Sequence, residues 1–301
     1  MASKFPNSGP VTLKTNLADY PVTRAVRSGQ VKSDVVALDF AGPKVAHEGF
    51  KPMVREGKFD AGELAIVTYL QARAYGKPLL MLPAVVMGRF QHQCIVYPAS
   101  RGEMAPKDIE GCRVGIRSYT QTTGMWVRGI LQHEYDVDLG RVTWVCSDDG
   151  HLAEHRDPPN VERTLPGAKI DQMVLNAEID AAILGADLPN EPRVRPLIKD
   201  PPAAAMAWCR KHGTVPINHV FVVDADLARA RPDVVKEIYR LLAESKKAVP
   251  PPAGGLDFHP FGLEALRKPL ELAIQYSHEQ ALIPRRFSVE ALFDDVTRQL
   301  S

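Results

Sequence analysis

The sequence predicts an α/β fold with two lobes, mostly parallel sheets and a central cleft between the lobes. Segments typical of strands and of helices alternate along most of the 301 residues, and such alternation indicates sheets built from strand–helix–strand units. The chain is long enough for two lobes of ordinary size, each with its own hydrophobic core. A cleft between two α/β lobes is a common binding place for a small ligand.

Short apolar runs predict the strands. Each run holds four or five residues rich in apolar or β-branched side chains, which is the pattern of a buried strand. A first strand ends shortly before Asp19. The other predicted strands are residues 35–38, 79–82, 94–97, 113–116, 142–145, 181–184 and 219–223.

Longer segments with apolar residues at helical spacing predict the helices. One ends at Gly76, one covers residues 122–135, one precedes residue 181, and one covers residues 233–248. In the last of these, Ile238, Leu241 and Leu242 are expected to face inward. The order of the strands suggests that lobe I comprises residues 1–95 and 218–301 and that lobe II comprises residues 96–217, so the chain crosses between the lobes twice.

Composition and charge exclude several classes of partner. Apolar residues make up 45% of the chain and charged residues 24%, which is ordinary for a globular protein. A net charge of +1 creates no field that favours nucleic acid or an acidic membrane. No run approaches the roughly 20 apolar residues of a membrane span, and the first residues, MASKFPNSGPVTLKT, lack the apolar core of a secretory signal. We expect a cytoplasmic protein (periplasmic if a leader was removed) that forms a homodimer, as many enzymes do.

The cysteines and histidines do not predict a metal site. Cys94, Cys112, Cys146 and Cys209 are scattered and form no CxxC or zinc-spaced cluster, so we expect four free thiols. His151 and His155 have helical i, i+4 spacing, but they lie in a polar, proline-flanked stretch without the HExxH pattern. Phosphate-loop, nicotinamide and Gly-x-Ser-x-Gly motifs are also missing from the sequence.

A row of hydroxyl-bearing residues joins the strand at 113–116 to the helix at 122–135. A helix start carries unpaired N–H groups and partial positive charge, so it attracts a carboxylate. Thr122 or Thr123 can cap this helix, and Tyr119 adds a hydroxyl donor. The row is either a plain cap or a ligand site, and its place after the end of a strand favours the ligand. Arg128 is either a second anchor or a solvent-facing side chain.

Two histidines and an arginine are expected near the two crossings. Arg89, in GRFQHQ, can hold a carboxylate with two parallel hydrogen bonds. His92 follows it closely, and His219 opens the strand that returns to lobe I. Imidazole can donate a proton and recover it near neutral pH. The alternative is a surface arginine and two structural histidines.

Three acidic or aromatic side chains complete the candidate site. Glu63 is expected to begin a helix, where it either balances the helix dipole or orients a histidine or a substrate hydroxyl. Gly62 beside it would let the backbone approach a ligand. Asp19 and Tyr20 end the first strand and are candidate ligand contacts. The motif His278-Glu279-Gln280 is expected to hold the C-terminal helices in place.

Several blocks of the sequence resemble one enzyme family. The blocks are FDAGELAIVTYL (59–70), GRFQHQCIVY (88–97), GCRVGIRSYTQTTGMWVRGIL (111–131), VPINHVFVV (215–223), FHPFGLEALRKPLE (258–271) and YSHEQALIPRRFSVEALF (276–293). Together they resemble the 4,5-dihydroxyphthalate decarboxylase family, which has the type II periplasmic-binding-protein fold. The segments at 17–23 and 185–187 depart from the family pattern, which leaves other hydroxylated aromatic acids open as substrates.

The resemblance implies a decarboxylase of a hydroxylated aromatic (di)carboxylic acid that needs no cofactor and no metal, because the ring itself takes up the electrons. It implies that His92 or His219 supplies a proton to the ring and that Glu63 orients a histidine or accepts from a hydroxyl. Arg89 and the segment from Tyr119 to Thr123 would hold a carboxylate. The alternative is a substrate-binding protein of a transporter or sensor for a small aromatic or heteroaromatic acid, which needs the same anchors but no proton donor.

Overall fold

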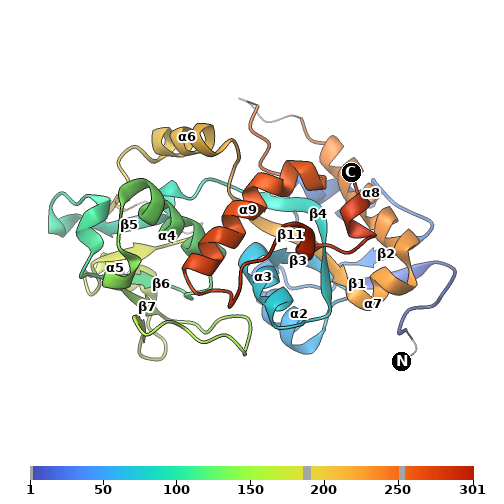
Figure 1. Cartoon of the computed structure of the whole chain (residues 1–301), viewed down its shortest axis with the longest axis horizontal. Helices are drawn as coiled ribbons and strands as arrows, with labels where there is room; N and C mark the ends of the chain where they lie inside the picture. The colour runs from blue at the N-terminus through green and yellow to red at the C-terminus, as the bar shows by residue number, and fades with distance from the viewer. Residues whose placement is uncertain (1–2, 186–190, 251–254) are drawn as a thin grey trace.

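The computed structural model describes residues 3–185, 191–250 and 255–301, and it contains two β-sheets. The first sheet has the strand order β2-β1-β3-β11-β4, and the second has the order β10-β5-β9-β6-β7-β8. Figure 1 shows the two sheets at opposite ends of an elongated molecule. The first consists of β1 (Val11–Asn16), β2 (Val36–Asp39), β3 (Ala61–Ala65), β4 (Leu79–Gly88) and β11 (Ile217–Asp224). The second consists of β5 (Ile95–Pro98), β6 (Arg113–Ile116), β7 (Thr143–Cys146), β8 (Val161–Arg163), β9 (Ala181–Ile183) and β10 (Val194–Pro196).

Both sheets mix parallel and antiparallel pairs. Among the named strands of the described residues, five pairings are parallel and four are antiparallel. The α/β class predicted from the sequence is confirmed, with only a small majority of parallel pairs. β11 runs antiparallel to both β3 and β4, and Ile217 pairs with Gly88. The chain therefore leaves the first sheet at the end of β4 and re-enters it at the start of β11, and these two points lie side by side. The division into lobes at residues 95 and 218 stays a prediction.

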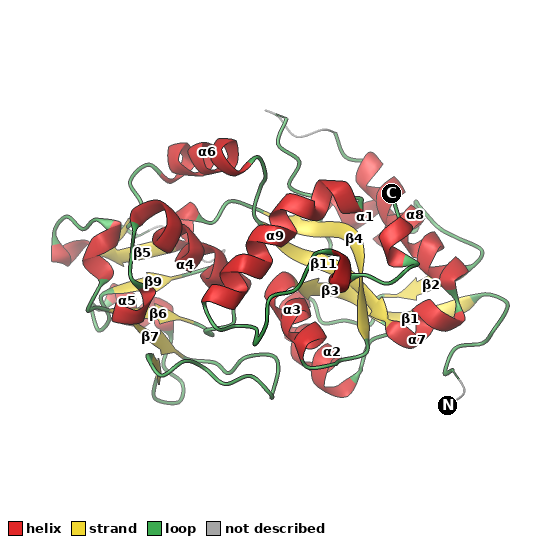
Figure 2. Cartoon of the chain, viewed as in Figure 1, coloured by secondary structure: helices red, strands yellow, loops and turns green. Residues whose placement is uncertain are grey.

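Helices cover the sheets and fill the space between them (Figure 2). α3, α4 and α9 pack against one another where the sheets meet, and the ring of Tyr276 on α9 would lie 2.1 Å from a side chain added at Gly129 on α4. Only glycine allows α9 to approach α4 so closely. The helices are α1 (Arg24–Arg27), α2 (Phe50–Glu56), α3 (Ile66–Ala74), α4 (Thr122–Tyr135), α5 (Ile170–Leu175), α6 (Pro201–His212), α7 (Ala225–Ala230), α8 (Pro232–Lys247) and α9 (Leu263–Glu279).

The segment around Glu63 differs from the sequence prediction. Residues Ala61–Ala65 form strand β3, so Glu63 lies inside a buried strand and does not begin a helix. The helix that ends before Gly76 is α3, which starts at Ile66. Gly62 has φ of +150°, and an added side chain would lie 2.3 Å from the carbonyl oxygen of Asn16. Glycine at position 62 therefore lets β1 pack closely against β3, because the backbone of β1 occupies the space of a side chain there.

The interior of the protein continues from one sheet to the other. A single cluster of buried apolar side chains includes Leu64 and Val85 of the first sheet and Val114 and Trp144 of the second. The four cysteines are free thiols. Within residues 3–185, 191–250 and 255–301, every helix is too short or too polar to traverse a bilayer.

Candidate functional site

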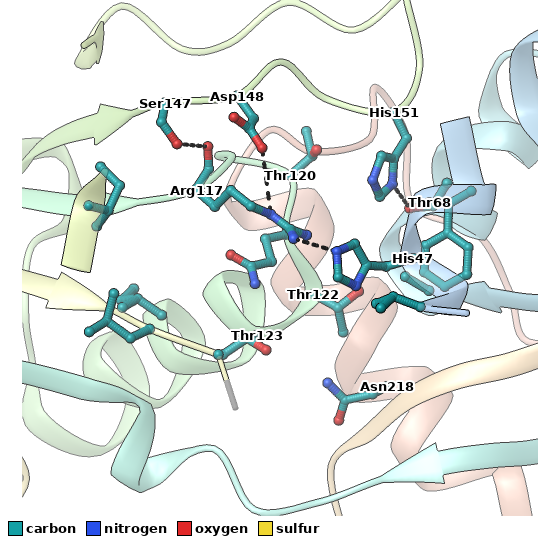
Figure 3. Close-up of a pocket in the computed structure, with 18 of the residues that line it drawn as sticks. His47, Thr68, Arg117, Thr120, Thr122, Thr123, Ser147, Asp148, His151 and Asn218 are labelled. Carbon is teal, nitrogen blue, oxygen red and sulfur yellow. Dashed lines mark hydrogen bonds and ion pairs between the residues drawn. The ribbon is translucent and has the colours of Figure 1, made fainter. Parts of the chain in front are cut away.

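A cavity of about 660 Å³ lies between the two sheets. β3, β4 and β11 of the first sheet border it through Ala65, Met87 and His219. In the second sheet, the parallel strands β6, β7 and β9 all end at the cavity, which is lined by residues directly after them. Figure 3 shows side chains from both sides pointing into this space. The carboxyl ends of parallel strands are the usual ligand position in α/β sheets.

Two helices begin at the cavity, and neither is capped by the side chain of its own N-cap residue. α4 starts at Thr122 after Gln121, and α3 starts at Ile66 after Ala65, and neither N-cap residue gives its helix a side-chain hydrogen bond. The expected cap by Thr122 or Thr123 is not formed, because these residues occupy the first turn itself. Thr122 Oγ1 instead accepts from the backbone N–H of Val67 at 3.3 Å. Both helix starts therefore direct partial positive charge towards the cavity.

Three cationic side chains line the same cavity. Arg89 donates from Nη2 to Thr123 Oγ1 at 3.2 Å and from Nη1 to the carbonyl of Gly185 at 3.4 Å, while its buried Nε has no partner within the described residues. Arg117 contacts His47 Nε2 at 3.0 Å and Asp148 Oδ2 at 3.8 Å. Lys169 is the third cation. Together with the two helix starts, these groups suit an anionic ligand.

A buried carboxylate holds the imidazole of His219. Glu63 Oε2 accepts from His219 Nδ1 at 2.6 Å and from the Tyr20 hydroxyl at 2.9 Å, and Glu63 Oε1 accepts from the backbone N–H of Ala18 at 2.6 Å. The Glu63 side chain is 0% exposed and that of His219 is 14% exposed. Burial and the neighbouring Glu63 carboxylate raise the pKa of Tyr20 far above its ordinary value, so Tyr20 stays a hydrogen-bond donor. Because Nδ1 is occupied, Nε2 is the ring nitrogen available on the cavity side.

Apolar groups surround the imidazole of His219. In the sheet, His219 pairs with Ala65 of β3 and Met87 of β4, and both of these residues line the cavity. The ring of Phe50 meets the His219 ring edge-on at a centroid distance of 5.1 Å. Apolar side chains therefore border the imidazole of His219 on the side of the cavity formed by the first sheet.

Two of the predicted ligand contacts, Tyr119 and Arg128, do not line the cavity. Arg128 is fully buried; it donates from Nε to Gln280 Oε1 at 2.8 Å and from Nη2 to the carbonyl of Tyr119 at 2.6 Å. The Tyr119 ring lies under the guanidinium at 4.1 Å, and its hydroxyl donates to the carbonyl of Gln280 at 3.1 Å. Burial lowers the pKa of Arg128. This pair ties the turn before α4 to the end of α9.

His92 and Asp19 also lie away from the cavity. His92 is 1% exposed, its ring packs edge-on against Trp208 of α6 at 6.3 Å, and its Nδ1 has no partner within the described residues. Burial lowers the pKa of His92 to about 4. Asp19 is exposed and pairs with Arg24 at 3.1 Å. Of the predicted residues, Arg89, Thr122, Thr123 and His219 line the cavity, and Glu63 and Tyr20 support His219 from behind.

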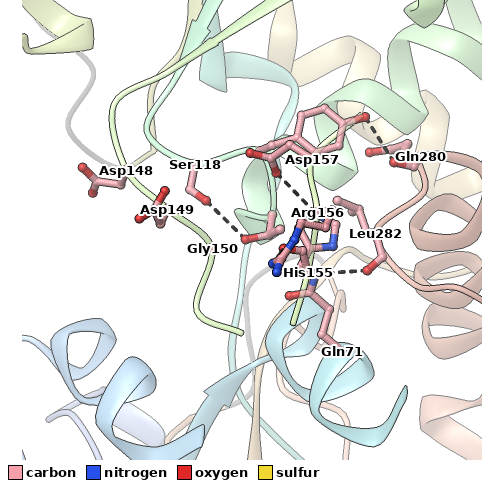
Figure 4. Close-up of polar contacts among 12 residues, drawn as sticks. Gln71, Ser118, Asp148, Asp149, Gly150, His155, Arg156, Asp157, Gln280 and Leu282 are labelled. Atoms are coloured by element: carbon pink, nitrogen blue, oxygen red, sulfur yellow. Dashed lines mark hydrogen bonds and ion pairs between the residues drawn. The ribbon is translucent and has the colours of Figure 1, made fainter. Parts of the chain in front are cut away.

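His47, Arg117 and His151 are among the cavity side chains that the sequence analysis did not propose as site residues. Arg117 directly follows β6, and His151 lies in the segment after β7. The strand-end rule that selected Thr122 would have selected these residues too. His151 and His155 turn to different partners: His151 Nδ1 contacts Thr68 Oγ1 at 2.8 Å, whereas His155 pairs with Asp157 at 3.3 Å (Figure 4). Residues 186 and 187, part of the segment that departs from the family pattern, lie outside the described residues.

Comparison with solved structures identifies the fold as that of type II periplasmic binding proteins, and no family model matches the chain. The periplasmic aliphatic sulphonate binding protein SsuA of Escherichia coli has a TM-score of 0.62 at 11% identity, covering 94% of this chain and 97% of that one. The alkanesulfonate-binding protein SsuA of Xanthomonas axonopodis pv. citri has a TM-score of 0.57 at 14% identity, covering 95% and 99%. These likenesses confirm the predicted fold.

In sequence, the chain is distantly related to 4,5-dihydroxyphthalate decarboxylase. It is 27% identical to that of Comamonas testosteroni over 253 residues, which cover 78% of this chain and 74% of the relative. It is also 27% identical to that of Pseudomonas putida over 213 residues, which cover 66% of this chain and 82% of the relative. The resemblance predicted from the sequence blocks is confirmed over most of the chain.

Proposed function

We propose that this protein is a cofactor-independent decarboxylase of a hydroxylated aromatic dicarboxylic acid similar to 4,5-dihydroxyphthalate. The contact between Glu63 and His219 is the observation that carries the proposal. A carboxylate on Nδ1 fixes the tautomer and orientation of an imidazole and stabilises its protonated form. An anion-binding cavity needs no such pair for binding alone, whereas the pair suits an imidazole that donates a proton.

The proton donor answers the main chemical difficulty of the reaction. Direct loss of carbon dioxide from an aromatic ring would leave an aryl anion, which is too unstable to form. Protonation of the ring carbon that carries the departing carboxylate avoids this anion, because the electrons of the broken C–C bond then return to the ring. His219 Nε2 is the group proposed to deliver that proton. The ring acts as its own electron acceptor, so the step requires no added cofactor.

The distribution of charge around the cavity supports an orientation of the substrate. Arg89, Thr123 and the start of α4 would hold the carboxylate that stays on the ring through charge-assisted hydrogen bonds and the helix dipole. The departing carboxylate would lie beside His219, among Phe50, Ala65 and Met87. Apolar surroundings disfavour a carboxylate and accept neutral carbon dioxide, so this arrangement would favour the product.

Turnover of a panel of hydroxylated aromatic acids tests the proposal. Purified protein is incubated with 4,5-dihydroxyphthalate, with its monocarboxylate and monohydroxy analogues, and with phthalate, and carbon dioxide release is followed. We expect release from dicarboxylic acids that have a hydroxyl para to a carboxylate. We expect none from phthalate, which has no hydroxyl, or from the monocarboxylate, which lacks the second carboxylate that Arg89 would hold. Calorimetric titration with phthalate measures binding separately.

A substrate-binding protein for a transporter or sensor is the rival function, because the three cations and the two helix starts would also suit simple capture of an aromatic acid. Under that function phthalate binds in the titration and no member of the panel releases carbon dioxide. That result would overturn the proposed decarboxylase.

A further inference from the structure

The decarboxylation needs a second group, which accepts the proton of the ring hydroxyl. The sequence suggested Glu63 for this role, but its two carboxylate oxygens already bind His219, Tyr20 and Ala18, and its side chain is 0% exposed. Glu63 is also absent from the cavity lining. On the basis of the proposed function, we infer that His151 is the base that accepts the proton from the hydroxyl para to the departing carboxylate.

Elements of both sheets hold His151 in place. It lies in the segment after β7 of the second sheet, but its contacts come from α2 and α3 beside the first sheet (Figure 3). Arg55 donates from Nε to the His151 carbonyl at 2.7 Å and from Nη2 to the Gly150 carbonyl at 2.9 Å. Thr68 Oγ1 lies 2.8 Å from His151 Nδ1. Backbone and ring are therefore both fixed, as a reacting group requires.

The hydrogen bond to Thr68 leaves Nε2 available for a ligand. When a neutral ring donates Nδ1–H to Thr68 Oγ1, its lone pair is on Nε2. Within the described residues, His151 Nε2 has no hydrogen-bond partner, and the residue lines the cavity. The Phe50 ring meets the His151 ring edge-on at 5.7 Å and the His219 ring at 5.1 Å. The two imidazoles therefore flank one side chain at the same end of the cavity.

Their electrostatic surroundings are opposite. His219 contacts the Glu63 carboxylate at 2.6 Å. Burial and nearby cationic or titratable groups lower the pKa of His151 to about 3, so it stays neutral and can accept a proton. The groups that act on it are Arg117, Lys51, His47 and Arg55, and the acidic side chains beside the same space are Glu48, Asp148 and Asp149. Two titratable groups with opposed surroundings are the usual arrangement of an acid and a base in one site.

A weak base is sufficient for this step. As His219 Nε2–H forms a bond to the ring carbon, the hydroxyl becomes that of a protonated ketone, which is a strong acid. The O–H bond breaks towards His151 Nε2, its electrons complete the C=O bond, and the ring becomes a dienone. The C–C bond to the carboxylate then breaks, carbon dioxide leaves, and the electron pair restores the aromatic ring as a phenolate. His151 returns its proton to that oxygen, and His219 takes a new proton from water, so one proton is consumed for each carbon dioxide released.

The two carboxylates that line the cavity, those of Asp148 and Asp171, fit the role less well. Asp148 is 56% exposed and lies 3.8 Å from Arg117. Asp171 lies in the first turn of α5, beside the second sheet. Both imidazoles, by contrast, lie edge-on to Phe50. A carboxylate would also repel an anionic substrate, whereas a neutral imidazole would not.

The chain provides a matched control for the test. His155 lies four residues further along the same segment, but it does not line the cavity, and its ring pairs with Asp157 (Figure 4). We compare wild type, His151→Asn and His155→Asn with 4,5-dihydroxyphthalate and with a ring-fluorinated analogue whose hydroxyl is more acidic. The measurements are kcat from pH 6 to 9, the Kd of phthalate and the melting temperature.

His151→Asn is expected to lower kcat about 100-fold, the size of a lost acid–base group, with the Kd of phthalate changed less than threefold. Its kcat should rise with pH and recover with the fluorinated substrate, because both changes supply a more ionised hydroxyl. His155→Asn should match wild type. A wild-type kcat in His151→Asn, or a loss that is equal for both substrates and independent of pH, would overturn the role of His151. If wild type itself releases no carbon dioxide, the proposed function fails first, and the role of His151 fails with it.

Discussion

His92 and His219 lie close to the two segments that join the sheets, yet their surroundings differ completely. His92 packs against Trp208 inside the protein, and its Nδ1 has no partner within the described residues. His219 lies between a buried carboxylate and an open cavity. Only the second environment supports proton transfer, because a carboxylate orients the ring and a ligand has access to it.

The difference shows which feature makes a histidine functional in this fold. Both residues satisfy the rule that ligands lie near the crossings, but that rule describes only the path of the backbone. The neighbouring side chain determines what each histidine can do: Glu63 on β3 contacts His219, whereas Trp208 on α6 covers His92. The predictions below test this comparison, beginning with the largest expected effect.

The same substitution in both histidines gives the sharpest contrast. His219→Asn is expected to lower kcat for 4,5-dihydroxyphthalate by about 10²–10⁴, the usual contribution of a general acid. His92→Asn should leave kcat within twofold, because the ring has no access to the cavity. Steady-state carbon dioxide release measures both. Equal losses in the two variants would show that the comparison is mistaken.

Removal of the partner tests the support behind His219. Glu63→Gln keeps the shape of the side chain but removes the charge that orients and stabilises the imidazolium, so kcat is expected to fall about 100-fold. Tyr20→Phe removes one donor to the same carboxylate and should cost less than tenfold. The Kd of phthalate, measured by calorimetry, should stay within threefold in both variants. A loss of affinity without a loss of kcat would assign Glu63 to binding.

Two arginines give a second comparison, which concerns anion binding instead of proton transfer. Arg89 lines the cavity, and Arg128 is fully buried between Tyr119 and Gln280. Arg89→Met is expected to weaken phthalate binding roughly 10–100-fold, the size of one or two charge-assisted hydrogen bonds, with little change in stability. Arg128→Met should instead lower the free energy of unfolding by about 2–3 kcal/mol. Chemical denaturation and calorimetry separate the two effects, and the reverse result would place the anion site elsewhere.

Local pattern was sufficient for much of the fold. The strand Arg113–Ile116 and the helix Thr122–Tyr135 occur where the sequence predicts them, because apolar periodicity and a polar junction mark them clearly. β3 was missed because all five of its residues are buried, so there is no alternation of polar and apolar positions, and glycine and glutamate weaken its strand signal.

The candidate site was less predictable, because its members depend on distant contacts. Arg128 was a reasonable anchor from its helix, but its partner Gln280 is 152 residues away in the sequence. His92 is covered by Trp208, which lies far along the chain on α6. His151 becomes a cavity residue only because Arg55 and Thr68, from the other side, hold it there. Such long-range contacts leave no local signal in the sequence.

The buried imidazole of His92 also predicts a dependence of stability on pH. Its pKa is lowered to about 4 in the folded protein, against about 6.5 when exposed. Between these values the unfolded chain binds the proton and the folded chain does not, so the free energy of unfolding falls as the pH falls from 6.5 towards 4. His92→Leu removes this group. The difference in unfolding free energy between pH 7 and pH 5, measured by denaturation, should shrink by about 2 kcal/mol. The difference in unfolding free energy between pH 8 and pH 7 should hardly change, because the imidazole is mostly neutral in both the folded and the unfolded state there. If His92→Leu leaves the difference between pH 7 and pH 5 unchanged, His92 is protonated inside the protein.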